Sequence, residues 1–131
     1  MQRMLGIDYG EKRVGLALSD ETGRFALPLV VLSNDKNLLR ETTRLAKEHS
    51  VQILVVGESK NFKQEDNPIM AAVNRFAKNL KQSGFEVVFE PELFTSAAAE
   101  RLQGKNSETD ASAAALILQS YLDRISPSDT M

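Results

Sequence analysis

The stretch Met4-Leu5-Gly6-Ile7-Asp8-Tyr9-Gly10 decides the predicted fold. It is an apolar run interrupted by one carboxylate and closed by a glycine, as in a β-strand that ends in a turn. Side chains alternate along a strand, so Gly6 and Asp8 should share one face. Asp is disfavoured inside strands, and its buried charge is costly unless it is paired or binds a metal. Asp8 is therefore a metal ligand or the start of the turn, and the stretch alone supports both interpretations equally.

The composition is that of an ordinary globular domain. The chain has 131 residues, of which 42% are hydrophobic and 26% are charged, as suits one domain. We expect residues 1–125 to form this domain and residues 126–131 to be a frayed tail. No apolar run is long enough to cross a bilayer, and the N-terminus has no signal-peptide pattern. We therefore expect a cytoplasmic protein with no membrane partner.

Cysteine, histidine and net charge exclude several kinds of site. The chain contains no cysteine and one histidine, His49, so a disulfide framework, a thiolate metal site and a cysteine nucleophile are excluded. One histidine also argues against histidine-centred zinc sites and serine triads. The formal net charge of −2 gives no bulk attraction for nucleic acid. A polyanionic partner would have to meet a local basic patch or a metal-loaded acidic cleft.

The chain begins with three predicted strands, over residues 3–9, 14–18 and 25–32. Short turns join them, so the three should be antiparallel. Gly10 is expected to provide a positive φ in the first turn. Pro28 cannot donate a hydrogen bond to a neighbouring strand, so the third strand should lie at an edge of the sheet or be locally irregular.

Helices and strands alternate in the rest of the chain. Asn67-Pro68 predicts a helix start and Gly84 the end of that helix. The expected elements are a helix over 38–46, a strand over 53–57, a loop over 58–66, a helix over 67–84, a strand over 85–89, a short helix from 95 or 96 to about 102, and a last helix capped by Thr109 that runs to 125. Helical crossovers make the later strands parallel. The order predicts an α/β fold with one mixed five-stranded sheet, three antiparallel strands followed by two parallel ones, and helices on both faces.

Three carboxylates that are far apart in the sequence should meet at one edge of this sheet. Asp8 ends the first strand and Glu92 follows the fifth strand. Asp110 lies in the first turn of the last helix, whose alanine-rich start can approach the first strand. Two hard cations held by such carboxylates can stabilise an in-line displacement at phosphorus, and Mg²⁺ or Mn²⁺ prefers oxygen ligands. The placement therefore predicts a metal-dependent phosphodiester hydrolase.

Each carboxylate also has a purely structural interpretation. Asp110 complements the helix dipole, an effect of about 0.3–1 kcal/mol. Glu92 suits a solvated loop. Glu90 alternates with Val88 and Glu86, which predicts an exposed strand face for all three.

Two motifs resemble the YqgF family, also called the RuvX type. They are Gly6-Ile7-Asp8-Tyr9-Gly10-Glu11-Lys12-Arg13-Val14-Gly15-Leu16-Ala17-Leu18-Ser19-Asp20 and Thr109-Asp110-Ala111-Ser112-Ala113-Ala114-Ala115-Leu116-Ile117-Leu118-Gln119-Ser120-Tyr121-Leu122. The family comprises nucleases of pre-16S ribosomal RNA processing that are related to Holliday-junction resolvases. The resemblance implies a ribonuclease-H-like fold. It also implies that Asp8, a Glu after the fifth strand and Asp110 are the metal-binding catalytic residues.

Two segments depart from the family pattern. Gly57-Glu58-Ser59 stands where the family has glycine, an apolar residue and proline. Pro91-Glu92-Leu93-Phe94-Thr95-Ser96 stands where the family reads Asp-Glu-Arg-Leu-Thr. Glu92 aligns with the family's Glu, and Glu90 is the alternative ligand if the strand end is shifted.

The expected partner is structured RNA, a pre-16S rRNA or its precursor particle. The candidate contacts to phosphate are Arg13, Lys12, Lys60 and Thr95, of which Arg13 has the best motif match. Branched DNA is an alternative substrate, and a non-catalytic nucleic-acid-binding assembly factor is an alternative function. The sequence leaves open whether the protein is a monomer or a homodimer.

Overall fold

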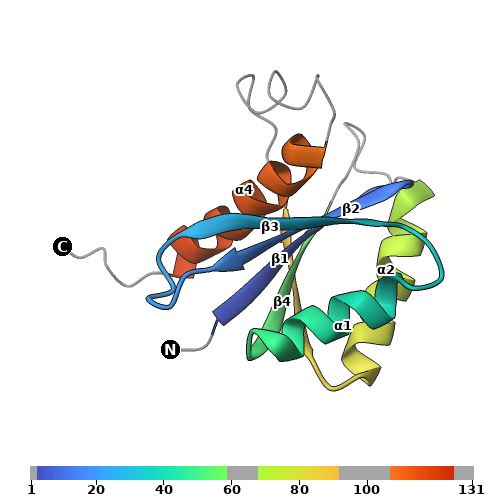
Figure 1. Cartoon of the computed structure of the whole chain (residues 1–131), viewed down its shortest axis with the longest axis horizontal. Helices are drawn as coiled ribbons and strands as arrows, with labels where there is room; N and C mark the ends of the chain where they lie inside the picture. Colours follow the sequence, from blue (N-terminus) through green and yellow to red (C-terminus); the bar gives the residue numbers. More distant parts are fainter. Residues whose placement is uncertain (1–2, 59–67, 92–106, 126–131) are drawn as a thin grey trace.

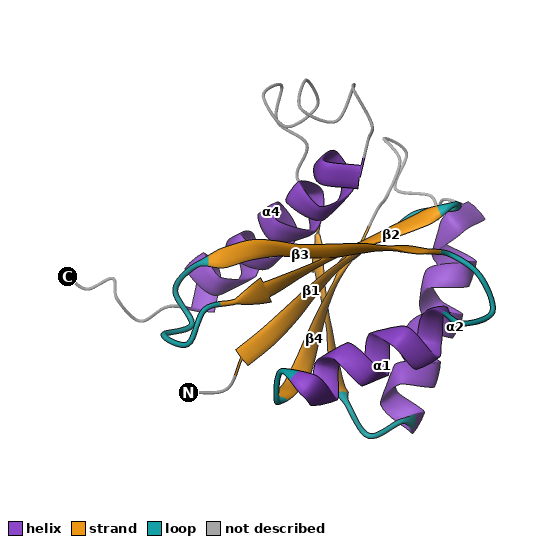
Figure 2. Cartoon of the chain, in the orientation of Figure 1, coloured by secondary structure: helices purple, strands orange, loops and turns teal. Residues whose placement is uncertain are grey.

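A computed structural model describes residues 3–58, 68–91 and 107–125 of the chain (Figure 1). Helices and strands alternate in the second half of the chain, as Figure 2 shows. The described elements are β1 (Arg3–Tyr9), β2 (Arg13–Ser19), β3 (Ala26–Ser33), α1 (Leu38–Glu48), β4 (Val51–Glu58), α2 (Pro68–Gln82), β5 (Glu86–Pro91) and α4 (Ser107–Ile125).

The five strands form one mixed sheet in the order β3-β2-β1-β4-β5. β1 and β2 are antiparallel, as are β2 and β3, whereas β4 is parallel to both β1 and β5. This confirms the predicted sheet. β3 lies at an edge, as its proline indicated, and its pairing shifts between Leu16 and Ala17, where Ala17 faces Pro28. Such an irregularity accommodates the missing N–H of proline.

Helices cover both faces of the sheet (Figure 1). Leu5 and Ile7 of β1 are fully buried in the core cluster that includes residues of α1 and α2. On the opposite face, Ala17 and Val55 are buried against α4. The alternation predicted for β1 is therefore confirmed, and the face that carries Gly6 and Asp8 is the face under α4.

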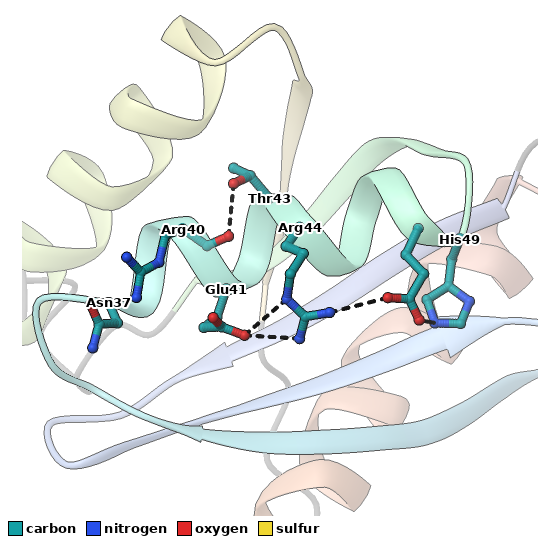
Figure 3. A network of polar contacts seen from close by, with 7 residues as sticks. Asn37, Arg40, Glu41, Thr43, Arg44 and His49 are labelled. Atoms are coloured by element: carbon teal, nitrogen blue, oxygen red, sulfur yellow. Dashed lines mark hydrogen bonds and ion pairs between the residues drawn. The ribbon is translucent and has the colours of Figure 1, made fainter.

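The outer face of α1 carries a network of ion pairs (Figure 3). Arg44 Nη2 lies 2.8 Å from Glu41 Oε1, and Arg44 Nη1 lies 3.1 Å from Glu48 Oε1. His49 follows as the C-cap residue of the helix. Exposed pairs of this kind contribute little to stability.

Two sequence-based expectations were wrong in detail. Gly10 does not adopt a positive φ; among the described glycines only Gly23 and Gly84 do. A Cβ at Gly10 would instead lie 2.6 Å from the carbonyl oxygen of Arg13, so the turn needs glycine for space. α4 begins at Ser107, two residues before the predicted cap Thr109. The short helix expected from residue 95 or 96, and the loop 58–66 beyond Glu58, lie outside the described residues.

Candidate active site

Asp8 is the next-to-last residue of β1, where it pairs with Gly15 of β2. Its side chain is half-buried. The face to which it belongs is the one covered by α4, because Gly6, two residues earlier, touches that helix directly. Asp8 therefore lies at the carboxyl end of a central strand, as predicted.

The contact at Gly6 is a close approach of helix to strand. A Cβ added at Gly6 would lie 2.7 Å from Leu118 Cβ and 2.9 Å from the carbonyl oxygen of Ala114. Real Cβ atoms are not found at such distances from their neighbours. The small residues of α4 and the missing side chain of Gly6 together let the helix backbone rest on β1, as the alanine-rich sequence of the helix predicted.

α4 runs in the opposite direction to β1 (Figure 1). Its later part lies near the amino end of β1. Gln119 binds the backbone of Ala26, which pairs with Ser19. Ser19 Oγ in turn accepts a hydrogen bond of 2.8 Å from the backbone N–H of Met4. The first turn of α4 must therefore point toward the carboxyl end of β1, where Asp8 lies.

The other two predicted metal ligands fall at the limits of the described part. Asp110 lies in the first turn of α4, and its backbone is described whereas its side chain is not. Glu92 follows Pro91, the last residue of β5, and lies outside the described residues. Among the side chains that the structure describes, no group of three or more His, Cys, Asp or Glu lies together to hold a metal. Of the three predicted ligands, only Asp8 has a side chain that the structure describes.

Glu90 does not lie on an exposed face, and that expectation was wrong. It is only 4% exposed. Ser120 Oγ donates a hydrogen bond of 2.9 Å to Glu90 Oε2, and Arg124 Nη2 forms an ion pair with Glu90 Oε1. The hydrogen bond and the negative charge of Glu90 raise the pKa of Arg124 above its ordinary value. Glu90, the alternative ligand, is thus bound to two side chains of α4.

Lys12 lies in the turn between β1 and β2, Arg13 is the first residue of β2, and both basic residues are exposed. Asn34, which follows β3, holds this turn with two hydrogen bonds. Its side-chain Nδ2 donates to the carbonyl oxygen of Gly10 at 2.7 Å, and its backbone N–H donates to that of Lys12 at 2.9 Å. Sequence reasoning missed Asn34, whose only signal was its position after a strand. Lys60 and Thr95, the other predicted contacts, lie outside the described residues.

None of the helices in the described part of the chain is long and apolar enough to cross a membrane.

Comparisons with known proteins give a consistent result. A family model described as RuvX, Holliday junction resolvase, matches residues 2–124. A protein of Sulfurihydrogenibium sp. (strain YO3AOP1) named "Putative pre-16S rRNA nuclease" is 35% identical over 96% of this chain and 93% of its own length. Proteins with the same name from Chlorobaculum tepidum and Anaplasma marginale are 31% and 37% identical, over 93% of this chain and 94% and 85% of their own lengths.

Solved structures of low sequence identity share the fold. A Fowlpox virus resolvase in complex with Holliday junction DNA has a TM-score of 0.62 at 14% identity, covering 95% of this chain and 99% of that one. RuvC of T. thermophilus with a Holliday junction substrate has a TM-score of 0.59 at 13% identity, covering 95% of each chain. These similarities confirm the predicted ribonuclease-H-like architecture.

Proposed function

The chain belongs to the RuvX family, and we propose that it is a nuclease that hydrolyses phosphodiester bonds in the 5′-end processing of pre-16S rRNA. Relatives 31–37% identical, aligned over most of the chain, carry the name of such a nuclease. The proposed substrate is a precursor RNA or precursor particle in the cytoplasm. The proposed nuclease unit is residues 1–125.

The contact between Gly6 and α4 is the observation that carries this proposal. Asp8 lies two residues beyond Gly6, about 6.6 Å along the strand. Asp110 lies one helical turn before Ala114, about 6 Å along the helix axis. Because the helix runs opposite to the strand, both displacements point to the same end of the sheet. The geometry thus supports a site in which the carboxylate of Asp8 faces the start of α4.

We propose Asp8, Glu92 and Asp110 as the ligands of Mg²⁺ or Mn²⁺. A metal ligand in an α/β sheet is expected at the carboxyl end of a parallel strand, and Asp8 lies at that end of β1. The three proposed donors are all carboxylates, which suit hard divalent cations. When bound, such cations would supply positive charge beside the scissile phosphate. The protein's own contribution is the close packing of α4 on β1 at Gly6, the two elements that carry Asp110 and Asp8.

Lys12 and Arg13 are the proposed phosphate contacts. They lie at the end of the turn after β1 and at the start of β2, a few residues after Asp8, so a phosphate bound near Asp8 is within the reach of long basic side chains. Asn34 restrains that turn from the other side. A restrained turn loses less conformational freedom when it binds a ligand.

The decisive experiment is cleavage of labelled precursor RNA with Mg²⁺ or Mn²⁺. Substitution Asp8→Asn should lower the cleavage rate at least about 100-fold, because substitutions in the outer shell of metal sites already cost 10–100-fold. A chelator should abolish cleavage and added Mn²⁺ should restore it. The matched control is Glu86→Gln, since Glu86 is exposed at the amino end of β5. Unchanged cleavage by Asp8→Asn would refute the assignment.

The alternative substrate is a four-way DNA junction, favoured by the family description. A junction needs two symmetric cuts, which requires a dimer with twofold symmetry. Sedimentation velocity combined with cleavage of a labelled junction separates the two substrates, because a strictly monomeric protein argues against junction resolution. RNA binding without turnover at any metal concentration would instead indicate an assembly factor.

A further inference from the structure

Polar side chains of α4 reach both edge strands of the sheet. Toward β3, Gln119 Oε1 accepts a hydrogen bond of 2.9 Å from the backbone N–H of Ala26, and Gln119 Nε2 donates one of 2.8 Å to the carbonyl oxygen of Arg24. The second proton of Nε2 is directed to Asp123 Oδ1 at 2.9 Å. The carboxamide thus binds the backbone of the edge strand as a neighbouring peptide group would.

Toward β5, the next residue of the helix makes the corresponding contact. Ser120 donates to Glu90, and Arg124, one turn later, forms an ion pair with the other oxygen of the same carboxylate. The guanidinium of Arg124 also lies 5.3 Å from the centre of the Tyr121 ring. Glu90 is nearly fully buried, and these two side chains provide a partner for each of its carboxylate oxygens.

Apolar packing alone specifies the orientation of α4 poorly. Its middle part, from Ala111 to Leu118, contains apolar residues at every position except Ser112. Ala113 is buried, yet Leu116 is 40% exposed, so apolar side chains occur on more than one side. Small apolar groups tolerate alternative packing. The carboxylate of Glu90 does not, because it is buried and a shift of α4 would leave it without its partners.

We propose that Gln119, Ser120, Arg124 and Glu90 fix the rotation and lengthwise position of α4 on the sheet, and thereby the position of Asp110 relative to Asp8. The inference rests on the proposed function, in which those two carboxylates bind metal together. A shift of α4 by one residue would move Asp110 by about 1.5 Å along the axis and turn it by about 100°. Displacements of about 1 Å can lower catalytic rates 100-fold. The four are positioning residues.

The test uses two variants that release α4 from one edge strand each. Gln119→Ala removes the contact with β3 and leaves every charge in place. The double substitution Glu90→Gln with Arg124→Ala removes the contact with β5 without leaving an unpaired buried carboxylate. Arg44→Ala is the matched control, because Arg44 and Arg124 have side chains 54% and 56% exposed and each pairs with a carboxylate. The single variant Arg124→Lys keeps the charge beside Glu90, so its interspin distance, Mn²⁺ affinity and kcat should equal those of the parent.

The position of the helix can be measured without catalysis. The chain has no cysteine, so spin labels at Ser112→Cys and Lys78→Cys attach only there. Ser112 is exposed on α4, and Lys78 is exposed on α2, across the sheet. Pulsed electron resonance gives the distance distribution between them. Mn²⁺ affinity is measured by titration on unlabelled protein, and kcat and KM are measured with precursor RNA.

Both releasing variants should broaden or shift the distance distribution, weaken Mn²⁺ binding at least tenfold and lower kcat at least tenfold with unchanged KM. Arg44→Ala should change none of these quantities. Folded releasing variants with the parent distribution and the parent Mn²⁺ affinity would overturn the proposal. If the double variant does not fold, Gln119→Ala decides alone. A parent that cleaves no RNA would refute the proposed function, whereas the distance distribution still decides whether the contacts fix α4.

Discussion

At the scale of single residues, Gly6 decides how closely the last helix approaches the first strand. Leu118 and the backbone of Ala114 occupy the space that a side chain at this position would need. A helix that rests on a strand brings its first turn to the end of that strand, where Asp8 lies. One small residue therefore couples the packing of the fold to the geometry of the proposed site.

We expect Gly6→Ala to displace α4, because one of the two clashing atoms belongs to the helix backbone and cannot rotate away. Overpacking of this kind lowers the free energy of unfolding by about 1–3 kcal/mol. Cleavage activity should fall more than tenfold at temperatures where the variant remains folded. Chemical denaturation and RNA cleavage measure the two effects.

Gly84→Ala is the control for a loss of stability alone. A Cβ at Gly84 meets nothing within 4 Å, but its φ of +100° is strained for any residue with a side chain. The variant should lose about 1 kcal/mol of unfolding free energy while it keeps full activity. Equal activity losses in the two variants would show that reduced stability, and not the position of α4, is responsible.

Sequence reasoning succeeded for residues whose environment is set by their own strand. The alternation along β1 was sufficient to place Gly6 and Asp8 on one face. It failed for Glu90, whose partners Ser120 and Arg124 lie thirty or more residues away on α4. It also gave the wrong reason for Gly10, which it expected to adopt a positive φ. Glycine is needed there because the carbonyl oxygen of Arg13 lies too close for a Cβ, and that contact depends on the path of the turn.

At the scale of elements, the turn between β1 and β2 is held by Asn34 from the connection between β3 and α1. We expect Asn34→Ala to release this turn and to raise KM for RNA, with kcat nearly unchanged, because the affected residues are the proposed phosphate contacts and not the proposed metal ligands. The lost hydrogen bond should lower the unfolding free energy by about 1 kcal/mol. Steady-state kinetics on labelled RNA measure both constants.

Asn37→Ala is the matched control in the same connection. The side-chain oxygen of Asn37 accepts a hydrogen bond from Arg40 on α1. Figure 3 draws both side chains at the start of the helix. Its loss should leave KM unchanged. A KM that rises equally in both variants would contradict the role given to Asn34.

The turn between β2 and β3 predicts a pH dependence. Desolvation is the largest single influence on Asp20 and raises its pKa. Hydrogen bonds from Thr22 and from the backbone N–H groups of Phe25, Arg24 and Gly23 together outweigh it and lower the pKa below its ordinary 3.8. A lowered folded-state pKa stabilises the protein above the unfolded-state value, and this contribution is lost as the pH falls through the folded-state value. Asp20→Asn should therefore lower Tm by a constant amount well above pH 3.8, and the difference should shrink below it.

Thermal unfolding followed by circular dichroism across pH 2 to 7 tests this expectation, a range chosen to span the ordinary pKa of about 3.9. Thr22→Val removes the hydroxyl that donates to both carboxylate oxygens of Asp20. Thr22→Val should lower Tm by a smaller amount than Asp20→Asn does. A Tm difference that stays constant down to the lowest pH would show that Asp20 contributes through its shape and not through its charge.

At the scale of the whole molecule, the order of elements was the most predictable property. Short turns fix antiparallel neighbours and helical crossovers fix parallel ones, so the mixed character of the sheet follows from the pattern of strands and helices. The polar attachment of α4 to both edges was not predictable, because Gln119 and Glu90 take their roles only after distant segments meet.

The whole chain carries a net charge of −2, so the proposed binding of RNA would have to come from a few local contacts. Each phosphate contact releases condensed counterions, so the logarithm of the binding constant falls linearly with the logarithm of salt concentration. A protein with few such contacts should show a shallow slope. Its affinity should still decline steadily as salt rises.

Arg13→Ala should reduce the steepness of this slope by about 0.7 for single-stranded RNA, or about 0.9 for a duplex. It should weaken the binding of different RNA sequences about equally, because a phosphate contact carries no base information. Fluorescence anisotropy of labelled RNA measures the slope, in an Asp8→Asn background that prevents cleavage. Arg44→Ala, on the outer face of α1, changes the net charge identically and should leave the slope unchanged. Equal slopes for Arg13→Ala and its parent would show that RNA binds elsewhere on the molecule.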